Sequence, residues 1–243
     1  MNKHFLINGV SGGLGFALSK TILEANHRVC GLSRSLDHRF AEILTNKNFQ
    51  YNALNKYSES EYQRVLDYKN PILSDFTHLI LNGGSALGLR DPLDISSMTQ
   101  VFSTNLFEHL ELVKLAVEKF PKLECICFVA SISGRESQGH PLYSAAKAAT
   151  LAYSRSLGRF LSGRGISVFS IAPGAFISES GYWSEIQDEH PEKFSRFVNE
   201  RLSVPSMQTA EDVAKFLYVL AMNHSVNMAG SNYLLDGGQG RSW

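Results

Sequence analysis

The sequence lacks the features that mark several classes of protein. No apolar run approaches the roughly 20 residues of a membrane-spanning helix, and the apolar stretch 5–9 is too short for the core of a signal peptide. The formal net charge is zero, with 23 basic and 23 acidic residues, so charge gives no reason to expect binding to nucleic acid or to an anionic membrane. We therefore expect a cytoplasmic protein with no membrane or nucleic-acid partner.

Cysteine is scarce as well. Cys30, Cys125 and Cys127 are the three cysteines, none belongs to a CxxC pair, and each lies in an apolar run. Such thiols are expected to be buried and reduced, as is usual in the cytoplasm. The eight histidines are scattered without the spacing of metal ligands, so the sequence predicts no metal site.

What the chain does contain is a regular alternation of apolar runs and helical patterns. Its 243 residues are enough for one large domain. Continuous apolar runs predict seven strands, at 4–8, 28–33, 49–53, 76–81, 123–130, 166–171 and 232–235. Helices are predicted at 14–25, 36–45, 59–68, 98–120, 142–161 and 209–222. The last of these has Thr209 followed three residues later by Asp212, as in a capping box.

This alternation predicts a parallel sheet that is covered by helices on both faces. The expected fold class is α/β, a single-domain Rossmann fold over 1–243 whose doubly wound parallel sheet has about seven strands. Ligands of such folds bind at the carboxyl edge of the strands. The irregular region 175–208 is expected to be a substrate-lid insertion rather than a second domain.

A glycine-rich turn joins the first predicted strand to the first helix. Residues 8–15 read NGVSGGLG, a G-x-x-x-G-x-G spacing that differs from the commoner G-x-G-x-x-G. Glycines let the backbone approach a pyrophosphate, and a helix N-terminus offers unpaired N–H donors. A flexible surface turn is the alternative, but the strand–glycine–helix order favours dinucleotide binding. The cofactor-binding residues predicted here are Gly9, Ser11, Gly12, Gly13, Leu14 and Gly15.

The second predicted strand ends in Ser33 and Arg34. An acidic residue at this place binds the ribose hydroxyls of NAD, whereas an arginine suits the 2′-phosphate of NADP. A guanidinium also holds phosphate through two parallel hydrogen bonds. Because no acid occupies the strand end, we predict that the protein prefers NADP(H) over NAD(H).

Tyr143 and Lys147 lie four residues apart in an Ala-rich helical pattern, so they share one face of the helix. An ammonium at that position favours phenolate, lowers the pKa of the tyrosine and prepares it to exchange a proton with a carbonyl or alcohol. Ser131 follows the apolar run that ends at Ala130 and is placed to hold the substrate oxygen. Taken alone, the pair also fits a solvated contact worth about a few tenths of a kcal/mol.

Together these motifs resemble the short-chain dehydrogenase/reductase family in its short, single-domain form. Residues 8–15 are similar to the family's T-G-x-x-x-G-x-G loop, and LNGG at 81–84 stands where the family has N-N-A-G. Asn105 and Ser131 match the family's catalytic Asn and Ser, and Tyr143-x-x-x-Lys147 matches its signature pair. Pro-Gly at 173–174 and Asp-Gly-Gly at 236–238 extend the resemblance over essentially the whole chain.

The chain departs from the family pattern at four positions. Asn8 replaces Thr, Gly83 replaces Ala, and Asn52 replaces an Asp that often contacts adenine. Ser178 stands where a Thr commonly bonds the carboxamide, and its hydroxyl is suited to the same contact. These changes affect the hold on the cofactor and remove no group that the reaction needs.

The resemblance implies hydride transfer between a nicotinamide and a substrate carbon. Tyr143 is then the general acid or base, and Lys147 lowers its pKa and bonds the nicotinamide ribose. Ser131 polarises the substrate oxygen, while Asn105 positions a water between Lys147 and solvent. The cofactor residues implied in addition to those above are Asn52, Ala53, Asn82, Gly83, Gly84, Tyr143, Lys147, Pro173, Gly174, Phe176 and Ser178.

The resemblance further implies a homodimer or homotetramer, with the Tyr143 helix and the 98–120 helix at the interface. A small-molecule carbonyl or alcohol is expected to meet Ser133, Gln138, His140 and an apolar lid from the insertion. The aromatic residues of that lid are Phe176, Tyr182, Trp183, Phe194 and Phe197. Three functions stay open: a ketone reductase like the 3-oxoacyl-carrier-protein reductases, an enzyme acting on a sugar or other polar intermediate, and a non-catalytic NADP-binding sensor or scaffold.

Overall fold

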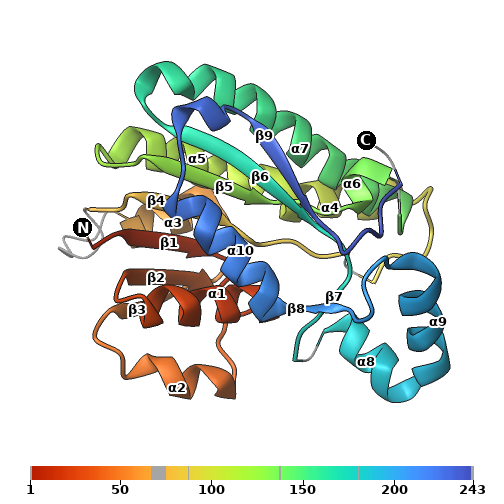
Figure 1. Ribbon diagram of the computed structural model, residues 1–243. Coiled ribbons are helices and arrows are strands. Elements are labelled where there is room, and N and C mark those ends of the chain that lie inside the picture. Colours follow the sequence, from red (N-terminus) through yellow and green to blue (C-terminus); the bar gives the residue numbers. More distant parts are fainter. Residues whose placement is uncertain (1, 67–74, 87, 137, 180, 242–243) are drawn as a thin grey trace.

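A seven-stranded parallel sheet forms the centre of the molecule (Figure 1). The computed structural model describes residues 2–66, 75–86, 88–136, 138–179 and 181–241. The strand order is β3-β2-β1-β4-β5-β6-β9, and every neighbouring pair is parallel. The strands are β1 His4–Asn8, β2 Arg28–Ser33, β3 Phe49–Ala53, β4 His78–Leu81, β5 Cys125–Val129, β6 Ser167–Pro173 and β9 Ser231–Leu235. The predicted α/β fold with a doubly wound parallel sheet is confirmed.

Helices cover both faces of this sheet. The α-helices are α1 Gly13–Glu24, α2 Ala41–Leu44, α3 Glu59–Leu66, α4 Ile95–Phe102, α5 Glu108–Lys119, α6 Ser133–Glu136, α7 Pro141–Leu161, α8 Tyr182–Glu189, α9 Pro191–Arg201 and α10 Ala210–Met222. Short 3₁₀ turns occupy His38–Phe40, Ser162–Arg164 and Val226–Met228, and β7 Phe176–Ile177 pairs with β8 Gln208–Thr209 in a second, two-stranded sheet. Within the residues that the structure describes, none of the helices is both long and apolar enough to cross a bilayer.

The alternation of side chains along each strand divides the interior into two layers. Phe5 and Ile7 of β1 pack with α1 and α10 on one face, whereas Leu6 packs with α3, α5 and α7 on the other. Successive side chains of a strand point to opposite faces, so a sheet that is buried on both sides needs apolar residues at nearly every position. This is why the strands are visible in the sequence as continuous apolar runs.

Several predicted helix boundaries differ from those observed. The predicted helix 98–120 is divided into α4 and α5 by a π-helical turn at Ser103–Phe107. The predicted helix 36–45 starts later, because the Asp37 side chain accepts a hydrogen bond from the Arg39 N–H and caps a 3₁₀ turn that leads into α2. Helix 59–68 is seen as α3 as far as Leu66, and residues 67 and 68 lie outside the described residues. The capping box at Thr209 is confirmed.

The topology brings the predicted ligand-binding segments to one edge of the sheet. Because β1, β2, β4, β5 and β6 are parallel, the loops that follow them all leave at the same edge. β1 lies between β2 and β4. The chain adds β2 and β3 on one side of β1 and then crosses to add β4, β5 and β6 on the other side, so the direction of strand addition reverses at β1. In open α/β sheets the crevice at such a switch point is where ligands bind.

Candidate active site

The loop between β1 and α1 forms a cradle of backbone groups. Gly12 is the N-cap of α1, and none of the described side chains caps the helix there, so the first N–H groups of α1 are available to an anion. Gly9 has φ +80°, and a Cβ on it would lie 2.6 Å from the nitrogen of Gly83. The two glycine-containing loops after β1 and β4 are therefore in direct backbone contact. The side-chain NH₂ of Asn82 also donates to the Gly9 carbonyl oxygen at 2.8 Å.

A first cavity of about 480 Å³ opens beside this cradle. It is lined by Gly9, Ser11, Gly12 and the exposed side chain of Arg34. The Arg34 guanidinium lies 5.9 Å from the centre of the Tyr57 ring. The further lining residues that were not among the predicted site residues are Asn8, Asn55, Lys56, Tyr57, Ser85, Gln100, Ser103, Thr104 and Glu108.

The structure places the segment after β3 differently from the expectation. The Asn52 side chain donates to the Cys30 sulfur at 3.1 Å, and neither Asn52 nor Ala53 lines the cavity. The residues that do so, beginning at Asn55, come just after the strand end. Ser33 and Arg34 were predicted because ligands bind at the carboxyl ends of parallel strands. The same rule applies to β3, and extending it a few residues beyond the end of this strand would have identified Asn55, Lys56 and Tyr57. Ser33 itself is buried and donates to the Ser35 carbonyl oxygen at 2.8 Å.

Arg39 is another residue near the cradle that sequence reasoning missed. Its guanidinium forms an ion pair with Asp37 and donates to the Ser11 carbonyl oxygen at 3.2 Å. It also donates to the carbonyl oxygen of Glu179, in the predicted lid, at 3.4 Å. No motif in the sequence signalled this contact, because it joins segments far apart in the chain.

A second cavity, of about 630 Å³, shares Asn82 and Gly84 with the first. It brings together three of the four predicted catalytic residues, Ser131, Tyr143 and Lys147. The predicted cofactor residues that also line it are Leu14, Asn82, Gly84, Pro173, Gly174, Phe176 and Ser178. Gly13 does not line either cavity, but a Cβ there would lie 2.4 Å from the Cβ of Ser178, so a glycine is needed for Ser178 to approach the cradle.

Tyr143 lies in the first turn of α7. The His140 ring accepts a hydrogen bond from the Leu142 N–H at 3.3 Å, and Pro141 follows it as the first helical residue, so the start of the helix is well defined. Burial raises the pKa of Tyr143, and a hydrogen bond with the Ser131 hydroxyl opposes this rise. The expected lowering of its pKa by Lys147 is not found, and the Lys147 nitrogen lies 5.7 Å from the centre of the Tyr143 ring.

Lys147 is almost completely enclosed. It is 3% exposed, and its ammonium donates to the Val129 carbonyl oxygen, at the end of β5, at 3.0 Å. Burial lowers the pKa of Lys147 to about 8, because removing water disfavours the charged form. The ammonium therefore has a pKa much closer to neutrality than that of an exposed lysine.

Asn105 lies behind the cavity, within the π-helical turn. Its side-chain NH₂ donates to the carbonyl oxygens of Ser85 and Val101 at 2.8 and 2.9 Å, while its Oδ1 is buried and has no hydrogen-bond partner among the residues that the structure describes. Gly84 has φ +150°, and a Cβ on it would lie 2.6 Å from this oxygen and 2.9 Å from the Lys147 nitrogen. Asn105 is thus brought beside Lys147 without lining the cavity.

The predicted substrate residues fall into two groups. Ser133, His140, Phe176, Tyr182 and Trp183 line the second cavity. Gln138 does not, and its side-chain oxygen instead accepts from Gln239 at 2.7 Å. Phe194 and Phe197 pack on the Trp183 ring, with centroids 6.4 and 4.1 Å away, and support the cavity wall from outside.

A glycine-rich turn and an open helix N-terminus that lead into a cavity with a tyrosine, a lysine and a serine are typical of dinucleotide-dependent oxidoreductases of the Rossmann class. Comparison with known proteins identifies the family within that class. The model of the family described as short chain dehydrogenase matches residues 3–188. The chain therefore belongs to the short-chain dehydrogenase/reductase family.

Individual relatives span nearly the whole chain. The 3-oxoacyl-[acyl-carrier-protein] reductase of Rickettsia typhi is 25% identical, over 97% of this chain and 96% of that protein. Isoepoxydon dehydrogenase of Penicillium expansum is 28% identical, over 97% of this chain and 93% of that protein. The solved structure of ElxO with NADP bound matches with a TM-score of 0.84 and 22% identity, covering 98% of this chain and 99% of that chain.

The lowered pKa of Lys147 leads to a prediction about stability. The unfolded chain holds this proton up to about pH 10.5 and the folded chain only up to about pH 8, so the cost of burying the charge is complete below pH 8 and disappears as the pH rises to 10.5. A shift of this size corresponds to about 3 kcal/mol, partly offset by the bond to Val129. Lys147→Met should raise the free energy of unfolding at pH 7 by about 2 kcal/mol while abolishing turnover.

Urea unfolding at pH 7, 8.5 and 10 measures this effect, with the exposed Lys215→Met of α10 as the matched control. The gain from Lys147→Met should shrink as the pH rises, and the control should show no such trend. Equal or lower stability of Lys147→Met at pH 7 would contradict the interpretation that the lysine is held charged at a cost.

Proposed function

We propose that the protein is an NADP(H)-dependent oxidoreductase that transfers hydride between the nicotinamide and a ketone or secondary alcohol, in the manner of 3-oxoacyl-carrier-protein reductases. The observation that carries the proposal is the convergence of Ser131, Tyr143 and Lys147 on one cavity. That cavity adjoins the glycine cradle through Asn82 and Gly84. The relative from Rickettsia typhi, a 3-oxoacyl-[acyl-carrier-protein] reductase, supports the choice of substrate class.

The residues present fit a nicotinamide dinucleotide. The uncapped N-terminus of α1 at Gly12 supplies donors for a pyrophosphate. Arg34 and Lys56, both facing the first cavity, supply positive charge for a 2′-phosphate. Pro173, Gly174 and Phe176 form a wall of the second cavity, where the nicotinamide would lie. When bound, the cofactor supplies the hydride chemistry.

The side chains of this chain handle the proton and the substrate oxygen. Tyr143, whose pKa is raised by burial, stays protonated at neutral pH and is suited to donate to a carbonyl oxygen. The Ser131 hydroxyl bonds the same phenol and orients the substrate oxygen beside it. Lys147, with a pKa of about 8, then returns a proton to the tyrosine.

Asn105 is the residue proposed to connect Lys147 with solvent. Its buried Oδ1 has no partner within the described protein and faces the same side of Gly84 as the Lys147 ammonium. A water accepting from the ammonium and donating to this oxygen would satisfy both groups. The π-helical turn around Asn105 supports this role, because such turns occur frequently at functional sites.

The central test removes the phenolic oxygen. Tyr143→Phe should lower kcat by about 10²–10⁴-fold, the usual contribution of a positioned acid–base group, and should leave the dissociation constant for NADPH within a factor of about two. Stopped-flow absorbance of NADPH with a ketone panel and nicotinamide fluorescence titration give the two quantities. Tyr153→Phe, ten residues later on α7 and packed on Phe128, is the matched control.

Full turnover by Tyr143→Phe would refute the acid–base assignment. A wild-type protein that binds NADPH but turns over no ketone, alcohol or sugar would instead favour the catalytically silent NADP-binding sensor or scaffold.

The preference for NADP(H) rests on the charges of the first cavity. No acidic residue ends β2, where Ser33 is followed by Arg34. ElxO, a structural neighbour, was solved with NADP bound. Glu108 also lines the cavity. Burial raises the pKa of its carboxyl, and the nearby Arg34 charge opposes this rise. The carboxyl therefore lies close enough to Arg34 to interact with its charge.

Arg34→Asp should reduce the ratio of NADPH to NADH affinity by about ten- to a hundredfold, the size of one lost charge-assisted hydrogen bond. Lys47→Asp makes the same change of charge in the turn before β3, at the opposite edge of the sheet, and should leave the ratio unchanged. Tighter binding of NADH than NADPH by the wild type, measured by fluorescence titration, would reject the proposed preference.

A polar substrate is a second candidate, favoured by one observation. The Nε2 atom of His140 is buried and has no hydrogen-bond partner in the described part of the chain, and His140 lines the second cavity together with Ser133. An unpaired imidazole nitrogen there favours a substrate with a further hydroxyl or carbonyl group. In either case, region 175–208 is proposed to act as the lid, since Tyr182 and Trp183 of α8 line the cavity from that side.

The proposed cytoplasmic location is supported by the three cysteines. Cys30, Cys125 and Cys127 are free and buried, and burial raises the pKa of each thiol, that of Cys30 to about 12. Such thiols remain protonated and inert. Unpaired cysteines are the usual state in a reducing compartment.

We also propose that the chain assembles as a homodimer or homotetramer through α5 and α7. Ala145, Ala148 and Ala152 form an exposed row of small side chains along α7, which allows close approach of a second helix. Phe107, directly before α5, and Phe160, near the end of α7, are 48% and 75% exposed. Burial of these side chains in an interface would remove a large apolar surface from water.

Sedimentation velocity at micromolar concentration should therefore show a dimer or tetramer. Ala152→Arg should shift the protein toward the monomer, because a charged side chain on this row prevents close packing. Val219→Arg, exposed on α10 at the opposite face of the sheet, is the control and should leave the assembly unchanged. A monomeric wild type would exclude the proposed interface.

A further inference from the structure

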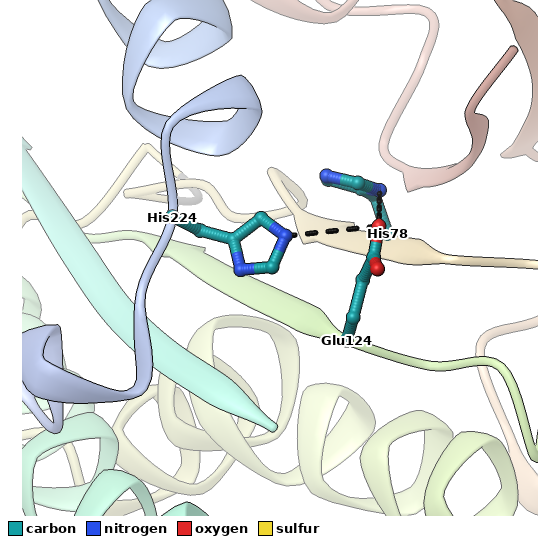
Figure 2. A group of neighbouring side chains, drawn as sticks. All are labelled: His78, Glu124 and His224. Carbon is teal, nitrogen blue, oxygen red and sulfur yellow. Dashed lines mark ion pairs between the residues drawn. The ribbon is translucent and has the colours of Figure 1, made fainter. Parts of the chain in front are cut away.

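Three potential metal ligands meet at the edge of the sheet opposite the active site. His78 is the first residue of β4, Glu124 directly precedes β5, and His224 lies in the connection between α10 and the 3₁₀ turn before β9. Figure 2 shows both imidazole rings directed toward the Glu124 carboxylate. One nitrogen from each histidine and one carboxylate oxygen all lie within 4.8 Å of one another.

His78 is held with one ring nitrogen available to a metal. The residue is fully buried, and its Nε2 lies 3.0 Å from the Ala221 carbonyl oxygen. A carbonyl oxygen only accepts, so Nε2 must carry the hydrogen and Nδ1 must have the lone pair. Nδ1 lies 3.8 Å from the Glu124 Oε1. A ring N–H bonded to a backbone carbonyl is the arrangement that orients metal-binding histidines.

His224 approaches the same carboxylate oxygen from another element. Its Nε2 lies 3.7 Å from the Glu124 Oε1. The two imidazole rings are 5.3 Å apart and nearly perpendicular, with an interplanar angle of 80°. Two imidazole nitrogens and a carboxylate oxygen form a ligand set that zinc adopts in proteins, with a water in the fourth position.

We propose that His78, Glu124 and His224 bind one Zn²⁺ ion per chain. Tetrahedral zinc with bonds of about 2.0–2.2 Å requires ligand atoms separated by about 3.3–3.5 Å, and the two nitrogen–oxygen separations of 3.7 and 3.8 Å come within a few tenths of an ångström of that range. The remaining adjustment falls to His224, whose side chain is 17% exposed and lies outside the regular helices and strands.

Two neighbouring groups compete with the metal. The Lys3 ammonium is paired with the Glu124 Oε1, which shows that this carboxylate already attracts a cation. The Thr77 hydroxyl lies 2.8 Å from Nδ1 of His78, but it also has the His4 carbonyl oxygen at 3.2 Å as an alternative acceptor. Zinc binding therefore requires Lys3 to move toward solvent and the Thr77 hydroxyl to turn to His4.

The bound ion would connect three parts of the fold that the chain itself does not join. β4, the start of β5 and the connection after α10 would be fastened at the amino edge of the sheet, far from the cavity at its carboxyl edge. Zinc should therefore raise the melting temperature without changing turnover. At a concentration of about 100 times Kd, the expected rise is about 5 °C or more.

The experiment uses chelator-treated, dialysed protein and zinc alone as the probe. Isothermal titration should give one saturable site, and Co²⁺ should give the visible absorption spectrum of a tetrahedral site. Glu124→Gln and His224→Ala should each weaken zinc binding by about tenfold or more, the loss that changes in the surrounding shell alone already cause. Both residues are partly exposed, so these variants are expected to fold.

Two further variants sharpen the test. Lys3→Met removes the competing ammonium and should tighten zinc binding, whereas a purely structural ion pair would give no such gain. His190→Ala, an exposed histidine between α8 and α9, should bind zinc as the wild type does. The proposal would be overturned if Glu124→Gln and His224→Ala bound zinc as tightly as the wild type. It would also be overturned if the wild type showed no saturable binding at micromolar zinc, since the cluster would then be only an ion-pair network.

Discussion

The burial of one ammonium group, that of Lys147, is the constraint around which the site is built. The protein gives this group one backbone carbonyl, that of Val129, in place of its water. The resulting pKa of about 8 reflects the cost of burying the charge, and it suits the proton transfer proposed for this lysine. Gly84 reflects the same constraint, since any larger residue would press on both Lys147 and Asn105. Destabilising features of this kind are characteristic of functional sites.

The sequence revealed those parts of the structure that depend on local spacing. Tyr143 and Lys147 were visible because a helix brings residues four apart onto one face. The sheet was visible because strands buried on both sides are continuously apolar. Arg34 and the glycine cradle followed from the rule that ligands meet the carboxyl ends of parallel strands.

Features that depend on contacts between distant segments were not visible. The π-helical turn at Asn105 leaves no mark in the apolar pattern of 98–120. The strand β3 was predicted with its observed bounds, but Lys56 and Tyr57 were missed because the cofactor residues were sought at Asn52 and Ala53 and not beyond the strand end. The expected effect of Lys147 on the pKa of Tyr143 was derived from spacing alone, whereas burial, a property of the folded chain, has the larger effect. The cluster of His78 and His224 has no spacing signature, since β4 and the segment after α10 meet only in the fold.

The two edges of the sheet are suited to different tasks. At the carboxyl edge the glycine-rich loop and the region 175–208 are joined by polar contacts, since Arg39 donates to the carbonyl oxygens of both Ser11 and Glu179. The Arg39 guanidinium is also paired with the Asp37 carboxylate and its side chain is only 8% exposed, so it holds the two segments to the turn before α2. If the region 175–208 opens as the proposed lid, the contact between Arg39 and Glu179 has to break. The amino edge has no such requirement, so its elements can be fixed rigidly. The cluster of His78, Glu124 and His224 is suited to that purpose, because a metal there would stabilise the sheet without restricting the proposed lid.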